Sequence, residues 1–453
     1  MYDITIIGAG VSAVFFSYTL SQRMPKLKIL LLEKGNMFDK RICPMESKKT
    51  DKCINCTVCG RFSGFGGLGK SEGKFNFTTD FGGDLHEKIG TDATQSSMKT
   101  VDEILRTFGG DKSPMYSTKN KTLENKLRES DFKSLNAEVR HLGLSLSCEI
   151  LQKMETELLS KIEIRSGVKV IDIEENSGEF DVRLSNTASV KTKKVVVATG
   201  QSGKGFVPEL CAKLGILYQE TRLDLGIRVE MPKNYLTNTL SESFEAKLQY
   251  QKDGFTATTY CMNPEGRIVK KYQYGMIMAD GQNYLEGTPT NSLNFSVFTP
   301  FYFSKPKDAQ DYAQAVISKI NKDRERIVCQ RYADFLQKKP TAANDLAENG
   351  ITPTIECEPG NLWDEVPNRC IEGALKILEI MSQLEQKGTP PDTLLYGLDA
   401  KFYEPKIATD IKFQSNIPNL YFIGDCSGVT YSLSQAAASG VYLASCMSDK
   451  AVL

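Results

Sequence analysis

Apolar positions near the start of the chain occur in short continuous runs separated by a helix-like stretch. Residues 4–7 form the first run, an apolar stretch covers residues 11–20, and a second run covers residues 29–32. Short runs of this kind are typical of buried parallel strands, and the stretch between them is long enough for a connecting helix. The first 35 residues therefore predict a strand–helix–strand unit of an α/β protein.

The rest of the chain predicts further helices, a strand meander and a second sheet. Residues 86–160 are mostly helical in pattern, and residues 164–183 predict two or three strands with a turn over residues 175–178. Strand-like runs then cover residues 226–230, 255–261 and 292–298, and helical stretches cover residues 308–337 and 368–386. A second group of strands and helices with its own pattern indicates a separate domain.

The turn after the first run contains Gly8-x-Gly10-x-x-Ala13, and the second run ends on Glu33. Gly8 permits the tight turn, Gly10 allows a pyrophosphate to approach the backbone, and Ala13 replaces the usual third glycine. The first N–H groups of the following helix favour negative charge, and Glu33 can accept hydrogen bonds from ribose hydroxyls. This pattern predicts a site for the ADP half of a dinucleotide.

Two later segments indicate that the dinucleotide is FAD. Residues 419–425 are another apolar strand, ending in Gly-Asp, and a helix of small residues follows. This segment resembles the closing motif of two-dinucleotide-fold flavoproteins, in which the Asp holds the flavin ribityl chain and the helix start approaches the pyrimidine ring. Residues 195–200 resemble the return strand of the same superfamily. The cofactor-binding residues predicted here are Thr199, Gly200, Gly424, Asp425, Ser434, Gln435 and Ala436.

These motifs predict a discontinuous Rossmann-like FAD-binding domain with a second α+β domain. The FAD-binding domain is expected to comprise residues 1–85, 160–224 and 395–453, with a helical insertion at 86–159. Residues 225–394 are expected to form the substrate or cap domain. Residues 200–205 contain glycines but already complete the flavin strand, so no second dinucleotide motif is present. NAD(P)H would therefore have to dock transiently, or the electrons must come from elsewhere.

Composition and charge exclude few classes of protein. Lysine plus arginine equals aspartate plus glutamate at 56 each, which gives no global field for nucleic acid or an anionic membrane. No apolar run approaches the length that spans a bilayer. We expect no signal peptide and a cytoplasmic location.

Four of the twelve cysteines lie close together, as Cys43-Pro44 and Cys53-x-x-Cys56-x-x-Cys59. Thiolates at this spacing can converge on one metal ion from a compact loop. The pattern suits an iron–sulfur cluster at least as well as zinc, and redox-active thiols without metal are a third reading. A fourth reading is a loop of free or buried cysteines that binds no metal.

A glycine-rich segment follows the cysteines directly. Its glycines allow close backbone approach to a pyrophosphate or flavin ring, and successive N–H groups can form an anion-binding nest. We predict that this segment runs along the cofactor. Its cofactor-binding residues are Gly66, Gly67, Gly69, Ser71 and Gly73.

The chain resembles the FAD-dependent dehydrogenases of the NAD/FAD-utilising type that share a Gly-Gly-Ala-Gly-x-Phe-Ser-Asp-Gly-Lys loop. Residues 66–74 are that loop, one residue shorter. Residues 226–230 are similar to the family's Gly-Val-Arg-Val-Glu, residues 260–266 to its Phe-Cys-Met-x-Pro-x-Gly, and residues 424–428 to its closing flavin motif. The resemblance covers essentially the whole chain, and a subgroup of the family carries a similar cysteine insertion.

Departures from the family pattern concern the substrate more than the cofactor. The family's Glu-x-Arg-x-Ser-Ser-Pro reads here as residues 399–405, with Lys401 in place of Arg. This change loses the planar bidentate fork of arginine. Glu72 replaces the loop's Asp, and Leu68 replaces its Ala. The resemblance therefore implies the fold and FAD, and leaves the substrate open.

Four residues are candidates for catalysis by an FAD-dependent oxidoreductase that acts on a small organic substrate. Lys74 can stabilise negative charge on reduced flavin or substrate, with Glu72 as its polar partner; a surface ion pair is the alternative. Arg228 can bind an anionic substrate group or form a structural salt bridge. Cys261 can be a flavin-facing thiol or a packed core cysteine.

Two other functions compete with a dehydrogenase whose electrons pass through a cysteine-bound cluster. One is a flavin-dependent RNA-modifying enzyme, which the neutral net charge does not favour. The other is a flavin and thiol redox sensor or electron-transfer module without catalysis. The partners expected for the leading function are a small-molecule substrate and an electron-donor protein.

Overall fold

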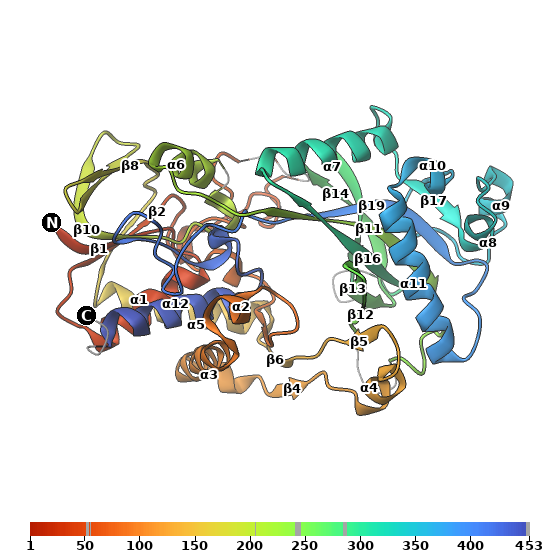
Figure 1. Ribbon diagram of the computed structural model, residues 1–453, viewed down its shortest axis with the longest axis horizontal. Helices are drawn as coiled ribbons and strands as arrows, with labels where there is room; N and C mark the ends of the chain where they lie inside the picture. The colour runs from red at the N-terminus through yellow and green to blue at the C-terminus, as the bar shows by residue number, and fades with distance from the viewer. Residues whose placement is uncertain (51–53, 55, 204, 241–245, 284–287, 450–453) are drawn as a thin grey trace. The chain divides into compact units, whose positions relative to one another are not determined.

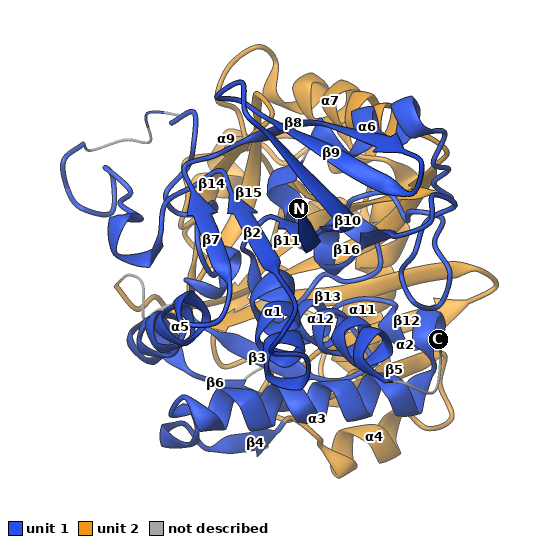
Figure 2. Ribbon diagram, turned by 90° about the vertical axis from the view of Figure 1, so that its left-hand side faces the viewer, with its two compact units in different colours: residues 1–117, 137–219, 403–453 blue, residues 118–136, 220–402 orange. Residues whose placement is uncertain are grey.

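The computed structural model describes residues 1–50, 54, 56–203, 205–240, 246–283 and 288–449. The chain divides into two compact units. Unit 1 comprises residues 1–117, 137–219 and 403–453, and unit 2 comprises residues 118–136 and 220–402 (Figure 2). Within the described ranges, none of the helices combines the length and apolar character needed to span a bilayer.

Unit 1 is built on a sheet whose central strands are parallel, in the order β7-β2-β1-β10-β20. The antiparallel strands β9 and β8 extend it beside the first half of β10. A small sheet of order β3-β6-β4 belongs to the same unit. The strands of unit 1 are β1 Tyr2–Ile7, β2 Ile29–Glu33, β3 Lys74–Phe77, β4 Met115–Ser117, β6 Glu138–His141, β7 Glu163–Ser166, β8 Val170–Asn176, β9 Glu179–Leu184, β10 Ser189–Val197 and β20 Leu420–Phe422. Its helices are α1 Val11–Arg23, α2 Leu85–Ile89, α3 Thr91–Thr107, α5 Gly143–Leu159, α6 Phe206–Leu214 and α12 Leu433–Ser448.

Alternating side chains of the unit 1 strands supply two separate cores. Ile4 and Ile6 of β1 pack with α1, α5 and α12 on one face. Ile7, with Leu30 and Leu32 of β2, packs with α6, β8 and β9 on the other face (Figure 1). Burial on both faces explains why these strands read as continuous apolar runs. The predicted α/β fold class is confirmed for this unit.

Residues 86–159, predicted as a helical insertion, are divided between the two units. Helices α3 and α5 contribute Val101, Ile104, Ile150 and Met154 to the same apolar cluster as Phe15 of α1. Residues 118–136 belong to unit 2 instead. Amphipathic helices bury their apolar face on any available partner, and here that partner is the parallel-sheet layer.

Unit 2 is built on an eight-stranded sheet of order β18-β17-β19-β11-β16-β13-β12-β5, with a separate β14–β15 hairpin. Its strands are β5 Phe132–Ser134, β11 Thr221–Pro232, β12 Leu248–Lys252, β13 Phe255–Pro264, β14 Arg267–Gln273, β15 Met276–Gln282, β16 Ser292–Phe303, β17 Val328–Arg331, β18 Glu358–Pro359 and β19 Leu394–Phe402. Its helices are α4 Lys121–Leu127, α7 Pro306–Asn321, α8 Tyr332–Leu336, α9 Ala343–Ala347, α10 Leu362–Glu365 and α11 Asn368–Glu385.

One face of the unit 2 sheet is apolar and the other is largely polar. Leu225, Ile227 and Val229 of β11 belong to the apolar cluster that includes Ile371 of α11. The helical stretch predicted over residues 308–337 contains α7 and α8 but is interrupted by β17, which pairs with β19. The buried run Ile327-Val328-Cys329 favours a strand, which its helical flanks obscured.

Candidate functional site

The turn that follows β1 requires a glycine at position 8. Gly8 has φ +98°, and its N–H donates to the carbonyl of Leu32 at 2.8 Å. A Cβ atom on Gly8 would lie 2.6 Å from the carbonyl oxygen of Ala198. Helix α1 begins at Val11 with no side-chain cap. Its first N–H groups have no partner inside the helix, which makes this end suitable for an anion.

Glu33 is buried at the end of β2, and its carboxylate contacts the backbone of three loops. Its carboxylate accepts hydrogen bonds from the N–H groups of Ala9 at 2.8 Å, Gly35 at 2.7 Å and Gly64 at 3.0 Å. A carboxylate has about four acceptor positions. Oε1 accepts two of these bonds and Oε2 accepts one, so Oε2 keeps a position for a ribose hydroxyl.

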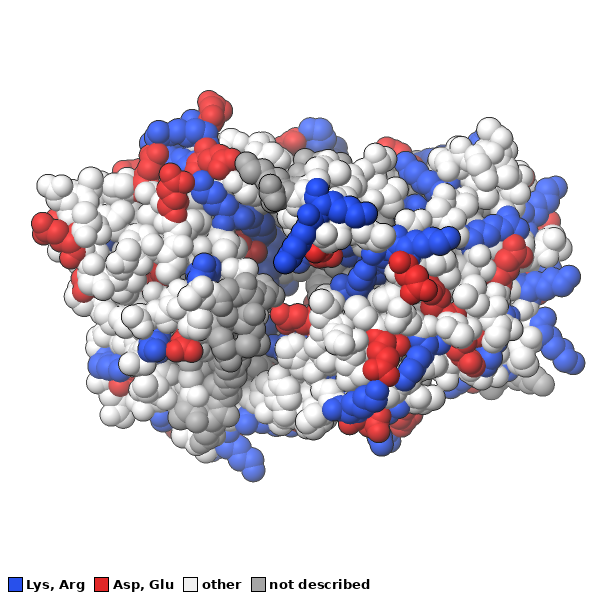
Figure 3. Space-filling model, turned by 180° about the vertical axis from the view of Figure 1, so that it is seen from behind, with Lys and Arg blue, Asp and Glu red and all other residues white. Residues whose placement is uncertain are grey.

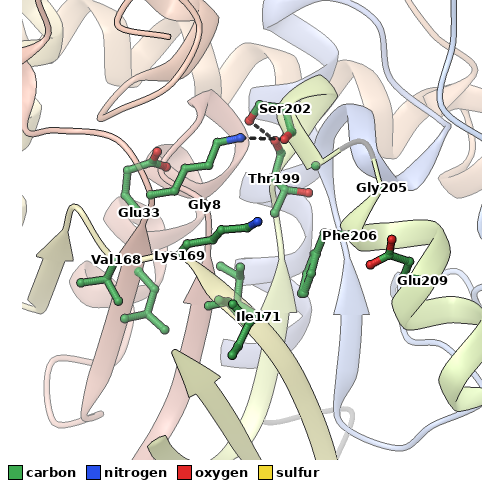
Figure 4. A pocket seen from close by; sticks show the side chains of 15 residues that line it. Gly8, Glu33, Val168, Lys169, Ile171, Thr199, Ser202, Gly205, Phe206 and Glu209 are labelled. Atoms are coloured by element: carbon green, nitrogen blue, oxygen red, sulfur yellow. Dashed lines mark hydrogen bonds between the residues drawn. The ribbon is translucent and has the colours of Figure 1, made fainter. Parts of the chain in front are cut away.

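A cavity of about 350 Å³ opens at the carboxyl ends of β1, β2 and β10 (Figure 4). Gly8 and Glu33 border it on one side, and Thr199 and Phe206 lie across from them. Lys34 donates to the carbonyl of Ser202 at 2.8 Å, and burial lowers the pKa of this lysine. Ligands of open α/β sheets bind outside the carboxyl ends of the strands, and the volume falls within the usual range for a ligand pocket. Its further lining residues are Ile7, Leu32, Val168, Lys169, Val170, Ile171, Gly203, Gly205 and Glu209.

The glycine-rich segment lies against the turn at Gly8 to Gly10. The N–H of Gly66 donates to the carbonyl of Ala9 at 2.8 Å. A Cβ atom on Gly67 would lie 3.0 Å from Cα of Gly10. The same atom on Gly69 would lie 2.9 Å from the Val11 side chain, at the start of α1. Glycine at these positions therefore lets the segment pack closely on the turn. The predicted contact of the segment with the cofactor stays a prediction. Gly73 continues the segment with φ +58°, whereas Ser71 is exposed.

Arg41 holds this segment in place and was missed by the sequence analysis. Its buried guanidinium donates to the carbonyls of Phe65 at 2.6 Å, Gly67 at 3.0 Å, Arg61 at 2.9 Å and Gly60 at 3.3 Å. Burial lowers the pKa of Arg41. A carbonyl cluster assembled from a loop has no sequence pattern, so an isolated arginine gives no signal of this role.

Replacing Arg41 by lysine is expected to weaken FAD binding at least about tenfold and to expose residues 56–67 to proteolysis. The ammonium keeps the charge but cannot reach four carbonyls, and each buried acceptor left unpaired costs about 1–3 kcal/mol. Flavin fluorescence titration and limited trypsin digestion measure the two effects. Arg23→Lys, at the exposed end of α1, is the matched control. Unchanged binding in Arg41→Lys would contradict this role.

The two residues predicted to act as a pair on the loop have different surroundings. Glu72 is exposed, and its carboxylate lies 3.4 Å from Nε2 of His141. Lys74 begins β3 and is the register partner of His141. Glu72 is therefore paired with His141, and Lys74 stays a candidate for catalysis.

The carboxyl end of the chain reaches the same sheet edge. A Cβ atom on Gly424 would lie 2.4 Å from Oγ of Ser12, so this turn packs against α1. The half-buried carboxylate of Asp425 accepts hydrogen bonds from Thr430 at 3.1 Å and from Gln201 at 3.4 Å. Burial raises the pKa of Asp425 to about 7, although both hydrogen bonds act to lower it. A strongly perturbed carboxyl is a typical mark of a functional site, although ion-pair and hydrogen-bond networks also perturb pKa values.

Gln201 belongs to the turn after β10 that also contains Thr199 and Gly200. The predicted return strand and the predicted closing motif are therefore joined by a side-chain contact. Gly200 has φ +54°. Val196 of β10 pairs with Tyr421 of β20, so both motifs leave adjacent parallel strands at one edge.

Residues at the start of α12 hold neighbouring backbone in position. Gln435 is fully buried, its amide donates to the carbonyls of Thr78, Phe81 and Gly83 at 3.1–3.3 Å, and its oxygen accepts from Leu85 N–H at 3.2 Å. The Ser434 hydroxyl donates to the carbonyl of Asn76. The polar atoms of the Ser434 and Gln435 side chains are therefore already used in hydrogen bonds within the protein. Any contact of Ser434, Gln435 or Ala436 with a cofactor would therefore use the helix backbone.

The four predicted metal ligands are only partly described. Cys43 and Cys59 are half-buried and Cys56 is exposed, whereas Cys53 lies outside the described residues. Among the described residues no group of three or more histidine, cysteine or acidic side chains could hold a metal ion. Cys426, next to Asp425, is buried, and burial raises the pKa of its thiol to about 12. It is therefore an unreactive thiol.

The predicted candidates in unit 2 have more restricted roles. Arg228 is completely buried, and its guanidinium donates to Ser296 at 2.9 Å and to Asn294. Glu230, two residues along the same strand, accepts from Tyr396 at 2.6 Å. These contacts favour the structural reading of Arg228 over substrate binding. Cys261 belongs to β13, and its side chain lies outside the described residues.

No protein-family model matches the chain, and no curated protein matches its sequence. Solved structures that resemble it include FrdA of E. coli quinol fumarate reductase, 14% identical, with a TM-score of 0.42 and coverage of 99% of this chain and 70% of that one. Glycine oxidase from Geobacillus kaustophilus is 11% identical, with a TM-score of 0.38 and coverage of 98% and 94%. The halogenase PltM in complex with FAD is 12% identical, with a TM-score of 0.40 and coverage of 99% and 68%. At these values the likenesses carry no argument about the chemistry of this chain.

Proposed function

We propose that this chain binds FAD in unit 1 and acts as an oxidoreductase on a small organic substrate. The observation that carries the proposal is the convergence of three motifs, each more than a hundred residues from the next, at one sheet edge. The turn at Gly8, the turn after β10 and Asp425 all adjoin the ends of parallel strands. An α/β fold that binds no dinucleotide does not require these three motifs to lie at one edge of the sheet.

Three parts of the cofactor would have partners in this arrangement. Glu33 would accept a ribose hydroxyl through its remaining Oε2 position, and the start of α1 would bind the pyrophosphate. Asp425 would accept hydroxyls of the ribityl chain, which favours its ionised form. When bound, FAD would supply hydride or electron transfer, and the protein supplies orientation and electrostatics.

The direct test of the activity is anaerobic reduction of the reconstituted flavoprotein. NADH, NADPH and a one-electron donor are each added, and the flavin absorbance is followed. Reduction by one of them, followed by reoxidation with a substrate, supports the oxidoreductase. With no second dinucleotide motif in the chain, NAD(P)H would dock transiently or an electron-donor protein would replace it. Failure of all donors would rule the proposal out.

The cysteine segment is proposed to bind a metal, with an iron–sulfur cluster first and zinc second. The support is the spacing of Cys43, Cys53, Cys56 and Cys59 immediately before the glycine-rich segment. Anaerobically purified protein is expected to contain iron and show broad visible absorbance, lost in both Cys53→Ser and Cys56→Ser. Cys211→Ser, which alters a buried thiol elsewhere in unit 1, is the control. Protein without iron or zinc would contradict the metal proposal.

A further inference from the structure

Two cysteines of unit 2 lie beside each other near one edge of its sheet. Cys329 belongs to β17, and Cys357 directly precedes β18, the strand that pairs with β17. Cys329 and Tyr396 belong to one apolar cluster, and Cys357 packs against it. The Cys329 thiol is in hydrogen-bonding range of the Cys357 thiol, and both thiols are free. Two thiols that are distant in the sequence are therefore neighbours in the fold.

Cys329 is the less accessible of the two thiols. It is completely buried, and the hydroxyl of Tyr396 is also in hydrogen-bonding range of it. That hydroxyl donates to the carboxylate of Glu230 at 2.6 Å. Burial raises the pKa of the Cys329 thiol well above its ordinary value, and the neighbouring Cys357 thiol raises it further. Cys329 is therefore a neutral thiol that reacts poorly with an oxidant on its own.

Cys357 is half-buried and lies in a segment, residues 349–357, that contains neither helix nor strand. A small oxidant can therefore reach its sulfur. The backbone of such a segment can also adjust more readily than that of a strand, which a disulfide requires, because its two sulfurs are only about 2.0 Å apart. Thr354 connects this segment to the same cluster, since its hydroxyl donates to Glu230 at 2.8 Å.

We infer that Cys329 and Cys357 form a redox-active pair that hydrogen peroxide converts into a disulfide. Peroxide oxidises the Cys357 thiol to a sulfenic acid and releases one water. The sulfur of Cys329 then attacks that of Cys357, so that an S–S bond forms and the S–O bond breaks. The hydroxyl leaves with the Cys329 proton as a second water. The two thiols lose two electrons in all, and the peroxide gains them. Both cysteines belong to unit 2, so the inference does not depend on FAD in unit 1.

Peptide mapping of the peroxide-treated full chain tests the inference. The protein is reduced, desalted, exposed to hydrogen peroxide, alkylated in denaturant and digested with trypsin without further reduction. The tryptic peptides 327–331 and 339–369 each contain one cysteine of the pair and no other cysteine. They are expected to be linked to each other in more than about half of the molecules, and to separate when dithiothreitol is added. Protein kept without peroxide is expected to show both peptides alkylated.

Two variants serve as controls. Cys357→Ser, at a half-buried position, is expected to lose the linked peptide and to leave Cys329 open to alkylation after unfolding. Cys370→Ser alters a buried thiol of the same unit that lies 3.4 Å from the Thr299 hydroxyl, and it is expected to keep the linked peptide. The peroxide dose is raised until the exposed Cys56 is oxidised. Absence of the linked peptide from the wild-type protein at that dose would overturn the inference.

Discussion

Replacing Gly8 by alanine is expected to abolish retention of FAD, with the dissociation constant rising more than about a hundredfold. The added Cβ would lie 2.6 Å from the carbonyl oxygen of Ala198, in a backbone conformation with φ +98°. Positive φ costs a non-glycine residue about 1–2 kcal/mol, and the clash adds about 1–3 kcal/mol by forcing the turn away from β10. Flavin fluorescence quenching on titration of the apoprotein measures the dissociation constant.

Gly178→Ala is the control that distinguishes the cost of a positive φ from the cost of the steric clash at Gly8. Gly178 has φ +86° in the turn between β8 and β9, and no atom lies within 4 Å of an added Cβ. This variant is expected to lose about 1 kcal/mol of stability in urea unfolding and to bind FAD normally. Normal FAD binding in Gly8→Ala would show that the turn does not hold the pyrophosphate.

Replacing Asp425 by asparagine is expected to stabilise the apoprotein above pH 7 and to weaken FAD binding. The folded-state pKa of Asp425 is raised to about 7 from its ordinary value of 3.8, so the carboxyl of the unfolded chain ionises at a lower pH than that of the folded chain. Wild-type stability therefore falls between pH 4 and 7 through this group, and the asparagine variant lacks that loss. After discounting for partial exposure, the difference is about 2 kcal/mol at pH 8 and close to zero at pH 4.

Cofactor binding should show the opposite pH trend in the wild-type protein. Ribityl hydroxyls donate to the ionised carboxylate, so FAD affinity is expected to rise from pH 5.5 to 8 and to become flat in Asp425→Asn. Urea unfolding and FAD titration at four pH values test both trends. Asp39→Asn, at an exposed position of unit 1, is the control. If Asp425→Asn binds FAD at pH 8 as tightly as the wild type does, Asp425 does not contact the cofactor.

The sequence predicts the backbone of the site better than its side-chain partners. The turn at Gly8, the acid Glu33 and the turn at Gly424 follow from local rules about glycine and strand ends, and the structure brings them to one sheet edge. Arg41 could not be predicted, because its partners are carbonyls of a segment without regular structure. The sequence also leaves the role of Arg228 open between substrate binding and a structural contact, because burial depends on how β11 packs between other strands.

The formal net charge of zero says nothing about how the charges are distributed over the surface. Figure 3 shows basic and acidic side chains interspersed on the visible face. Net charge also does not reveal which charges are paired. Lys271 of the β14–β15 hairpin is paired with Asp399 of β19, which belongs to a different sheet. Such a pair depends on how the two sheets pack, which the sequence alone does not fix.

The central claim is that this chain holds FAD at the carboxyl ends of the unit 1 strands. The most direct measurement is identification and quantification of the flavin released on denaturing the purified protein, after incubation with excess FAD and desalting. The account predicts one FAD per chain in the wild type and none in Gly8→Ala. A wild-type protein that releases no flavin, or that binds FAD equally well with and without the Gly8 substitution, would contradict it.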